Sequence, residues 1–217
     1  MGRMRTFERL IVVQAARDLF WDKGFDATSL SDLEAATGLK RSSLYHAFGS
    51  KRGLFDAAVE DYQDTVIRPR LRILTGPGIG RVSLLAYFDN LRSAVAALPV
   101  DSPRRGCLLV NCAAGLAGHD DPARQVVEDY RLDLTNTLQD ALRAAGAAAG
   151  ETGRDLSRER ARTLTSLGMS AMLLARVNAT ESVALLDTAT EQIRSWVPAV
   201  PGDAGSTATA GTAGTAV

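Results

Sequence analysis

The segment from Ser29 to Phe55 constrains the fold of this chain more than any other part of the sequence. Its apolar spacing and its central Gly38 predict two short helices joined by a tight turn, followed by the start of a third helix. The outward positions of the second helix hold small polar, aromatic and basic side chains. Such side chains bond to bases and phosphates, so the segment predicts a helix-turn-helix that binds DNA.

The first helix of this segment has a start signal and a stop signal. Ser29 followed by Asp32 is a capping-box pattern, with Asp in place of the usual Glu or Gln. It starts a helix expected over residues 30–37. Gly38 supplies the left-handed residue that ends this helix.

The second helix is expected from Lys40 or Arg41 to about Phe48. Leu44 and Phe48 are four residues apart and therefore face inward, which leaves the other sides of the helix to solvent. Ser50 is expected to cap the next helix, whose N-terminal amides add a phosphate site. The second helix of such a motif lies in the major groove, with its N-terminal residues at the base edges.

Charge is distributed unevenly along a chain that is neutral overall, with 25 basic and 25 acidic residues. Residues 1–52 hold nine basic and six acidic residues, a net charge of +3, so the remainder carries −3. A mildly basic N-terminal segment followed by an acidic remainder suits a local contact with DNA.

Other composition signals exclude several classes of protein. No run of about 18 apolar residues occurs, so no transmembrane helix is expected, and the N-terminal stretch is too interrupted by charge for a secretory signal. Cys107 and Cys112 are too few and too close for a disulfide framework. His119 and the two acids after it fit a helix-capping turn better than a metal site. We expect a cytoplasmic protein without metal or cofactor.

Helical periodicity continues to Val197 and predicts an all-α chain of about nine helices, with no strand pattern. Ser157 is expected to cap a helix that runs to about Asn178, and Thr180 to cap the last helix. Both of these helices are apolar on more than one side, which favours packing against a second subunit. The expected domains are a three-helix DNA-binding domain, a helical ligand-binding and dimerisation domain, and a disordered tail, over residues 1–52, 53–197 and 198–217.

The helix-turn-helix segment resembles the signature of the tetracycline-repressor (TetR/AcrR) family over about residues 7–55. The blocks that carry the resemblance are Gly24-Phe25-Asp26-Ala27-Thr28-Ser29, Ala36-Thr37-Gly38-Leu39, Ser43-Leu44-Tyr45-His46-Ala47-Phe48, and Ser50-Lys51 with Leu54. This resemblance implies a homodimeric repressor that binds a palindromic operator, releases it on binding a small-molecule inducer, and dimerises through its last two helices.

Within this resemblance, Lys40 departs from the family pattern, which often has Ser or Thr at that position to cap the recognition helix. Lys40 is therefore expected to contact phosphate, with the helix start left to water or backbone. The candidate DNA contacts are Thr28, Ser29, Lys40, Arg41, Ser42, Ser43, Tyr45, His46 and Lys51.

The C-terminal helices offer a candidate effector cavity with mostly apolar walls and a few polar groups, as small-molecule pockets require. Only about half of the candidates are expected to touch a ligand, the rest being ordinary core. The candidates are Phe88, Leu91, Cys107, Leu108, Asn111, Cys112, Tyr130, Met169, Met172 and Arg176.

Cys107 has two interpretations. It follows Arg104-Arg105-Gly106 at a helix N-terminus, where the dipole and the cations lower a thiol pKa, and residues 106–111 resemble a subgroup of the family that senses electrophiles and oxidants. Alternatively, it is a small buried residue that fills helix packing. A thiol enzyme on the same fold would need a base near this cysteine, and a protein-interaction module would need no DNA contact. We expect no enzyme.

Overall fold

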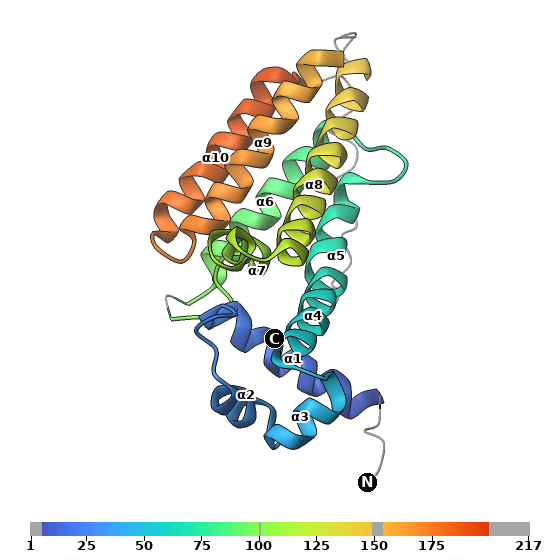
Figure 1. Cartoon of the computed structure of the whole chain (residues 1–217). Coiled ribbons are helices and arrows are strands. Elements are labelled where there is room, and N and C mark those ends of the chain that lie inside the picture. The colour runs from blue at the N-terminus through green and yellow to red at the C-terminus, as the bar shows by residue number, and fades with distance from the viewer. Residues whose placement is uncertain (1–5, 100, 149–153, 200–217) are drawn as a thin grey trace.

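The structure is a computed structural model that describes residues 6–99, 101–148 and 154–199, so nearly all of the predicted disordered tail lies outside the described residues. Within these ranges every regular element is helical and no strand occurs, which confirms the predicted all-α fold. Figure 1 shows a small head formed by the first three helices below a larger helical body. No helix in the described part of the chain is long and apolar enough to span a membrane.

The head consists of α1 (Thr6–Lys23), α2 (Leu30–Thr37) and α3 (Arg41–Phe48). The predicted capping box is present: the Ser29 hydroxyl accepts a hydrogen bond from the Asp32 amide, and the Asp32 carboxylate accepts one from the Ser29 amide. Gly38 ends α2 in the left-handed conformation, with φ of 69°. The sequence therefore predicted the helix-turn-helix almost residue for residue.

A long helical rod leads from the head into the body. It comprises α4 (Lys51–Tyr62), a π-helical stretch over Gln63–Ile67, α5 (Arg68–Leu71) and a 3₁₀ turn over Arg72–Leu74. Ser50 caps α4 as predicted, because its hydroxyl accepts a hydrogen bond from the Gly53 amide. The regular α pattern is interrupted just before Pro69, whose missing N–H removes one helical hydrogen bond.

Five more helices complete the body, and α9 and α10 lie side by side along one flank (Figure 1). Helix α10 packs mainly on α6 and α9, while α8 packs on α9. If the rod from α4 to α5 is counted as one helix, the described residues form nine α-helices, in agreement with the predicted number of about nine. The five are α6 (Arg81–Ala97), α7 (Leu108–Ala114), α8 (Asp121–Ala148), α9 (Arg154–Leu174) and α10 (Ala179–Trp196).

The structure corrects two predicted helix starts. Ser157 does not cap α9, because this helix starts earlier, at Arg154, and leaves Ser157 buried inside it. Thr180 does not cap α10. That position belongs to Asn178, whose side-chain oxygen accepts a hydrogen bond from the Glu181 amide. Both Asn178 and Thr180 are good cap residues, so composition could not separate them.

The predicted capping turn before α8 is present. The Asp120 carboxylate accepts a hydrogen bond from the Ala123 amide at 2.7 Å, and Pro122 stands in the first turn, where its missing N–H costs nothing. The described residues include no group of three or more His, Cys, Asp or Glu side chains that could hold a metal ion.

The assignment of the α10 cap generates a stability prediction. Replacing Asn178 with Ala leaves an amide at the helix start without its acceptor and should lower the free energy of unfolding by about 1 kcal/mol. Thr180→Ala, two residues away, should change it by no more than a few tenths. Urea unfolding followed by circular dichroism measures both. Equal losses for the two variants would contradict the assignment.

Candidate nucleic-acid interface

Helix α3 lies with one side in the core of the head and the other side open to solvent. Leu44 and Phe48 are buried, as their spacing predicted. Tyr45 is 38 % exposed, and its ring lies 5.5 Å from the Arg41 guanidinium. The exposed residues of this face and of the turn before it are Lys40, Arg41, Ser42, Ser43, Tyr45 and His46.

Neighbouring helices hold both ends of α3. The Arg41 amide donates a hydrogen bond of 2.6 Å to the Glu34 carboxylate of α2, so Glu34 caps the recognition helix. The prediction that water or backbone satisfies this helix start is wrong, although the Lys40 side chain indeed makes no capping bond. At the other end, the Arg9 guanidinium of α1 donates to the Ala47 carbonyl at 2.9 Å and lies 4.3 Å from the centre of the Phe48 ring.

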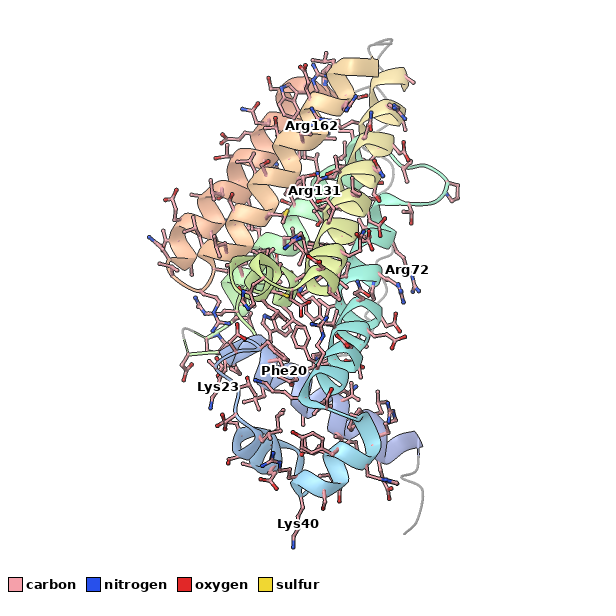
Figure 2. All side chains as sticks on the ribbon, in the orientation of Figure 1. Phe20, Lys23, Lys40, Arg72, Arg131 and Arg162 are labelled. Carbon is pink, nitrogen blue, oxygen red and sulfur yellow. The ribbon has the colours of Figure 1, made fainter. Side chains whose placement is uncertain are left out.

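Two predicted phosphate contacts flank the recognition helix. Lys40 is exposed and extends from the far end of the head, away from the body (Figure 2). Lys51 is half-buried at the start of α4, with its ammonium 4.3 Å from the centre of the Phe25 ring. Because a cation over an aromatic face is attracted to it, this contact restricts where Lys51 presents its charge.

Thr28 and Ser29 lie at the start of α2, but they differ in exposure. Thr28 is buried, and its hydroxyl donates to the Gly24 carbonyl at 2.6 Å, so the side chain closes the turn and does not present its hydroxyl to solvent. Ser29 is exposed but engaged in the capping box. Hydrogen bonds from Lys23, the larger effect, and from Ser29 hold the pKa of Asp32 well below its usual range. The Asp32 carboxylate of the capping box therefore stays ionised.

The charge pattern around α3 favours an anionic partner. Residues 40–52 contain four Lys or Arg side chains and no Asp or Glu. The hydroxyl groups of Ser42 and Ser43 and the imidazole of His46 lie on the exposed face of α3, next to the Arg41 guanidinium. A basic surface with hydrogen-bonding side chains on a protruding helix is suited to phosphate contact together with readout of base edges.

The predicted effector residues do not form one cavity. Two small voids of about 10 and 20 Å³ lie inside the body, and each has room for about one water molecule at most. Phe88 is fully buried and Met169 half-buried in the core, and neither lines a void or cleft described for this structure. The predicted residues that line the smaller void are Leu91, Cys107, Tyr130 and Met172.

The other predicted residues line a cleft of about 410 Å³ between the head and the body, which we call the joint cleft. Its walls include four aromatic residues that were not among the predicted ligand contacts. They belong to α1, to the turn after it and to α4, and no local spacing links them to α7. The predicted residues in the wall are Leu108, Asn111, Cys112 and Arg176; the unpredicted aromatic ones are Phe20, Trp21, Phe25 and Phe55.

Arg176 and Asn111 attach the body to the end of α1. The Arg176 guanidinium donates to the Trp21 carbonyl at 2.8 Å and to the Asp22 carbonyl at 2.6 Å. The Asn111 amide donates to the same Trp21 carbonyl at 3.5 Å. These carbonyls belong to the last turn of α1, where a helix has no partners of its own for them.

The two cysteines differ in environment. Cys107 occupies the N-cap position of α7, as predicted, but it is only 1 % exposed and lines the smaller void beside Tyr87 and Tyr130. Cys112 is half-buried in the joint cleft, and burial raises the pKa of its thiol to about 11. Cys112 is therefore protonated at neutral pH. The burial of Cys107 favours the packing interpretation.

Comparisons with known proteins agree with this geometry. Residues 12–58 match the family model described as bacterial regulatory proteins, tetR family. The HTH-type transcriptional repressor BdcR of Escherichia coli is 32 % identical over 140 residues, which cover 64 % of this chain and 68 % of BdcR. The uncharacterized HTH-type regulator YezE of Bacillus subtilis is 28 % identical over 82 % of this chain and 91 % of its own length.

Solved structures extend the similarity to the whole fold. A cysteine mutant of the TetR family regulator CifR, complexed with 26-base-pair operator DNA, superposes with a TM-score of 0.72 at 28 % identity. The alignment covers 88 % of this chain and 98 % of CifR. Since these relatives are transcriptional regulators, the expectation that the chain is no enzyme is confirmed. This chain belongs to the TetR family of bacterial regulatory proteins.

Proposed function

We propose that this protein is a cytoplasmic repressor that binds a palindromic operator as a homodimer and releases it when a small molecule binds. Residues 1–52 would form the DNA-binding domain, and residues 53–197 the effector-binding and dimerisation domain. The two recognition helices of a dimer would enter successive major grooves about 34 Å apart. BdcR and ComR of E. coli, both described as transcriptional repressors, and the CifR–operator complex support this assignment.

The observation that carries the proposal is the exposed face of α3, held at one end by Glu34 and at the other by Arg9. Ser42 and Ser43 stand in the first turn of this helix, the part of a recognition helix that reaches base edges. Tyr45 and His46 follow on the exposed sides.

Phosphate contacts would flank this face. Lys40, Arg41 and Lys51 would contact phosphates, together with the free amides at the start of α4. Thr28 would act only by shaping the turn before α2.

Dimerisation is assigned to α9 and α10. The outer side of α9 exposes Leu173 (44 %), and the turn after it exposes Val177 (81 %). The exposed positions of α10 are small at Thr180, Ala184, Thr188 and Ser195 and charged at Glu181, Glu191 and Arg194. Apolar and small side chains on two adjacent helices suit packing against the same pair in a second copy as a four-helix bundle. A symmetric contact of this kind would also set the distance between the two heads.

The function is tested by selecting bound fragments from genomic DNA with the purified protein. A single enriched palindrome is expected. Replacing Tyr45 with Ala should raise the dissociation constant for that site at least about tenfold, because each subunit loses a contact. Fluorescence anisotropy measures this, and circular dichroism verifies that the variant is folded. Failure to enrich any sequence, or unchanged affinity of the variant, would contradict the proposal.

The assignment of Lys40 to phosphate predicts a change in salt dependence. Lys40→Ala should reduce the slope of log affinity against log salt by about 0.9 per subunit, hence about 1.8 per dimer. Arg72→Ala removes the same charge from the body, far from the head (Figure 2), and should leave the slope unchanged. Titrations at several salt concentrations measure both slopes, and equal changes would show a general charge effect instead of a contact.

The dimer assignment predicts that Leu173→Glu produces monomers, because it places a charge in the proposed bundle. Leu132 on α8 is similarly exposed (41 %), so Leu132→Glu is the matched control and should leave the dimer intact. Sedimentation velocity separates the two states. The monomeric variant should also lose most of its operator affinity, since both half-sites must be held at once. A dimeric Leu173→Glu protein would exclude this interface.

A further inference from the structure

The joint cleft has the size of a ligand site and lies where the head meets the body. Its volume of about 410 Å³ falls within the range of about 300–1,000 Å³ that small-molecule pockets occupy. The voids inside the body are at least an order of magnitude smaller. The joint cleft is therefore large enough to hold an effector before any rearrangement, whereas these two voids are not.

One wall of the cleft is an aromatic cluster. The ring centres of Phe20 and Phe55 lie 5.1 Å apart with their planes perpendicular, and those of Phe25 and Phe55 lie 5.0 Å apart. Phe20 and Phe25 are stacked at 6.1 Å. In Figure 2 Phe20 stands at the level where the head meets the body. Phe20 and Phe55 are buried behind the wall, so the half-buried Phe25 presents the ring that a flat aromatic guest can contact.

The opposite side of the cleft supplies hydrogen-bond donors. Arg176 and Asn111 already donate to carbonyls of α1. On the α1 side of the cleft, the indole N–H of Trp21 is buried and has no acceptor in the described part of the chain. A buried donor without a partner gains a hydrogen bond when an acceptor oxygen reaches it.

The charges around the cleft favour an uncharged guest. Its lining contains two acids and two bases. Lys23 forms an ion pair with Asp32 at 2.7 Å, and Arg176 lies 3.5 Å from the Asp22 carboxylate. Asp26, the second acid of the lining, lies 3.9 Å from His119. No excess of positive charge remains to attract an organic anion, so the oxygen that meets the donors is a neutral carbonyl in preference to a carboxylate.

We propose that the joint cleft binds an uncharged, flat aromatic compound with a carbonyl group, and that this binding is the effector signal. The inference rests on the proposed function, because an effector acts only through DNA binding. The aromatic part would lie against Phe25, the half-buried ring of this cluster. The carbonyl oxygen would compete with the Trp21 and Asp22 carbonyls for Arg176.

The consequence for DNA binding follows from this competition. When Arg176 turns to the ligand, α1 loses the contacts that fix its end to the body, and a guest between α1 and α7 separates them. The head then changes its orientation, and with it the spacing of the two recognition helices. Binding shifts the equilibrium away from the DNA-binding state because the cleft is more open in the other state, to which the ligand therefore binds more tightly.

The test uses the full-length protein and two probes, 2-acetylnaphthalene and 2-ethylnaphthalene, which differ in the carbonyl. The chain has two tryptophans, so the indole N–H signals of ¹⁵N-labelled protein report Trp21 in the cleft and Trp196 at the end of α10. Saturable shifts of the Trp21 signal alone are expected. The ketone should bind about threefold to tenfold more tightly, the contribution of one net hydrogen bond.

Two tryptophan substitutions on α7 are matched controls. Ala114 lines the cleft, whereas its neighbour Ala113 is exposed outside it. Ala114→Trp should fill the cleft, weaken ketone binding at least tenfold and weaken operator binding even without ligand. Ala113→Trp should leave both unchanged. Thermal melting establishes that both variants fold.

Coupling provides the last measurement. The ketone should raise the operator dissociation constant, and saturating operator DNA should raise the ketone dissociation constant by the same factor. If the free protein binds operator but the ketone leaves Trp21 unshifted, binds Ala114→Trp equally well, or does not alter operator affinity, the cleft inference is overturned and the proposed function stands. If the free protein binds no operator, the proposed function itself fails.

Discussion

The hydrogen bonds from Arg176 to the last carbonyls of α1 are the contact on which the arrangement of head and body depends. A helix end cannot satisfy these carbonyls itself, so the body that supplies the donor also fixes the direction of α1. Its neighbour Arg105 is buried and donates to the Leu98 and Ala175 carbonyls, both at 3.0 Å. Arg105 thereby fixes the segment that carries Arg176, and two arginines bonded to helix ends connect α6, α9 and α1.

Ion pairs surround this contact and complete the connection. Arg104 of the loop before α7 pairs with Asp18 of α1 at 2.7 Å, and Arg52 of α4 pairs with Asp120 at the start of α8. Partly exposed pairs contribute little stability individually, so we assign them to orientation. Since α1 also carries Arg9, which caps the end of α3, any movement of α1 against the body is passed directly to the recognition helix.

The structure could be predicted from the sequence where the signal is local, and could not where the interacting partner is distant in the chain. Ser29, Asp32 and Gly38 predicted α2 because a capping box and a left-handed glycine act within one helical turn. The cap on α3 was missed because Glu34 belongs to the preceding helix, and a surface glutamate has many uses. The joint cleft was missed for the same reason: its aromatic wall and its α7 wall are more than about fifty residues apart, so Leu108, Asn111, Cys112 and Arg176 were assigned to a cavity inside the body.

This division explains why the helix-turn-helix can be predicted from the sequence and the joint cleft cannot. A recognition helix must be short, capped and polar on one side, and those requirements restrict every position of residues 29–51. A ligand cleft requires only that two elements leave space between them. The sequence does not distinguish an aromatic residue that lines such a space from one that packs in the core. Phe20 and Phe55 are buried on both interpretations. Only the position of α7, the helix that faces them, decides whether they form core or wall, and Asn111 connects α7 to the end of α1 that Arg176 also holds.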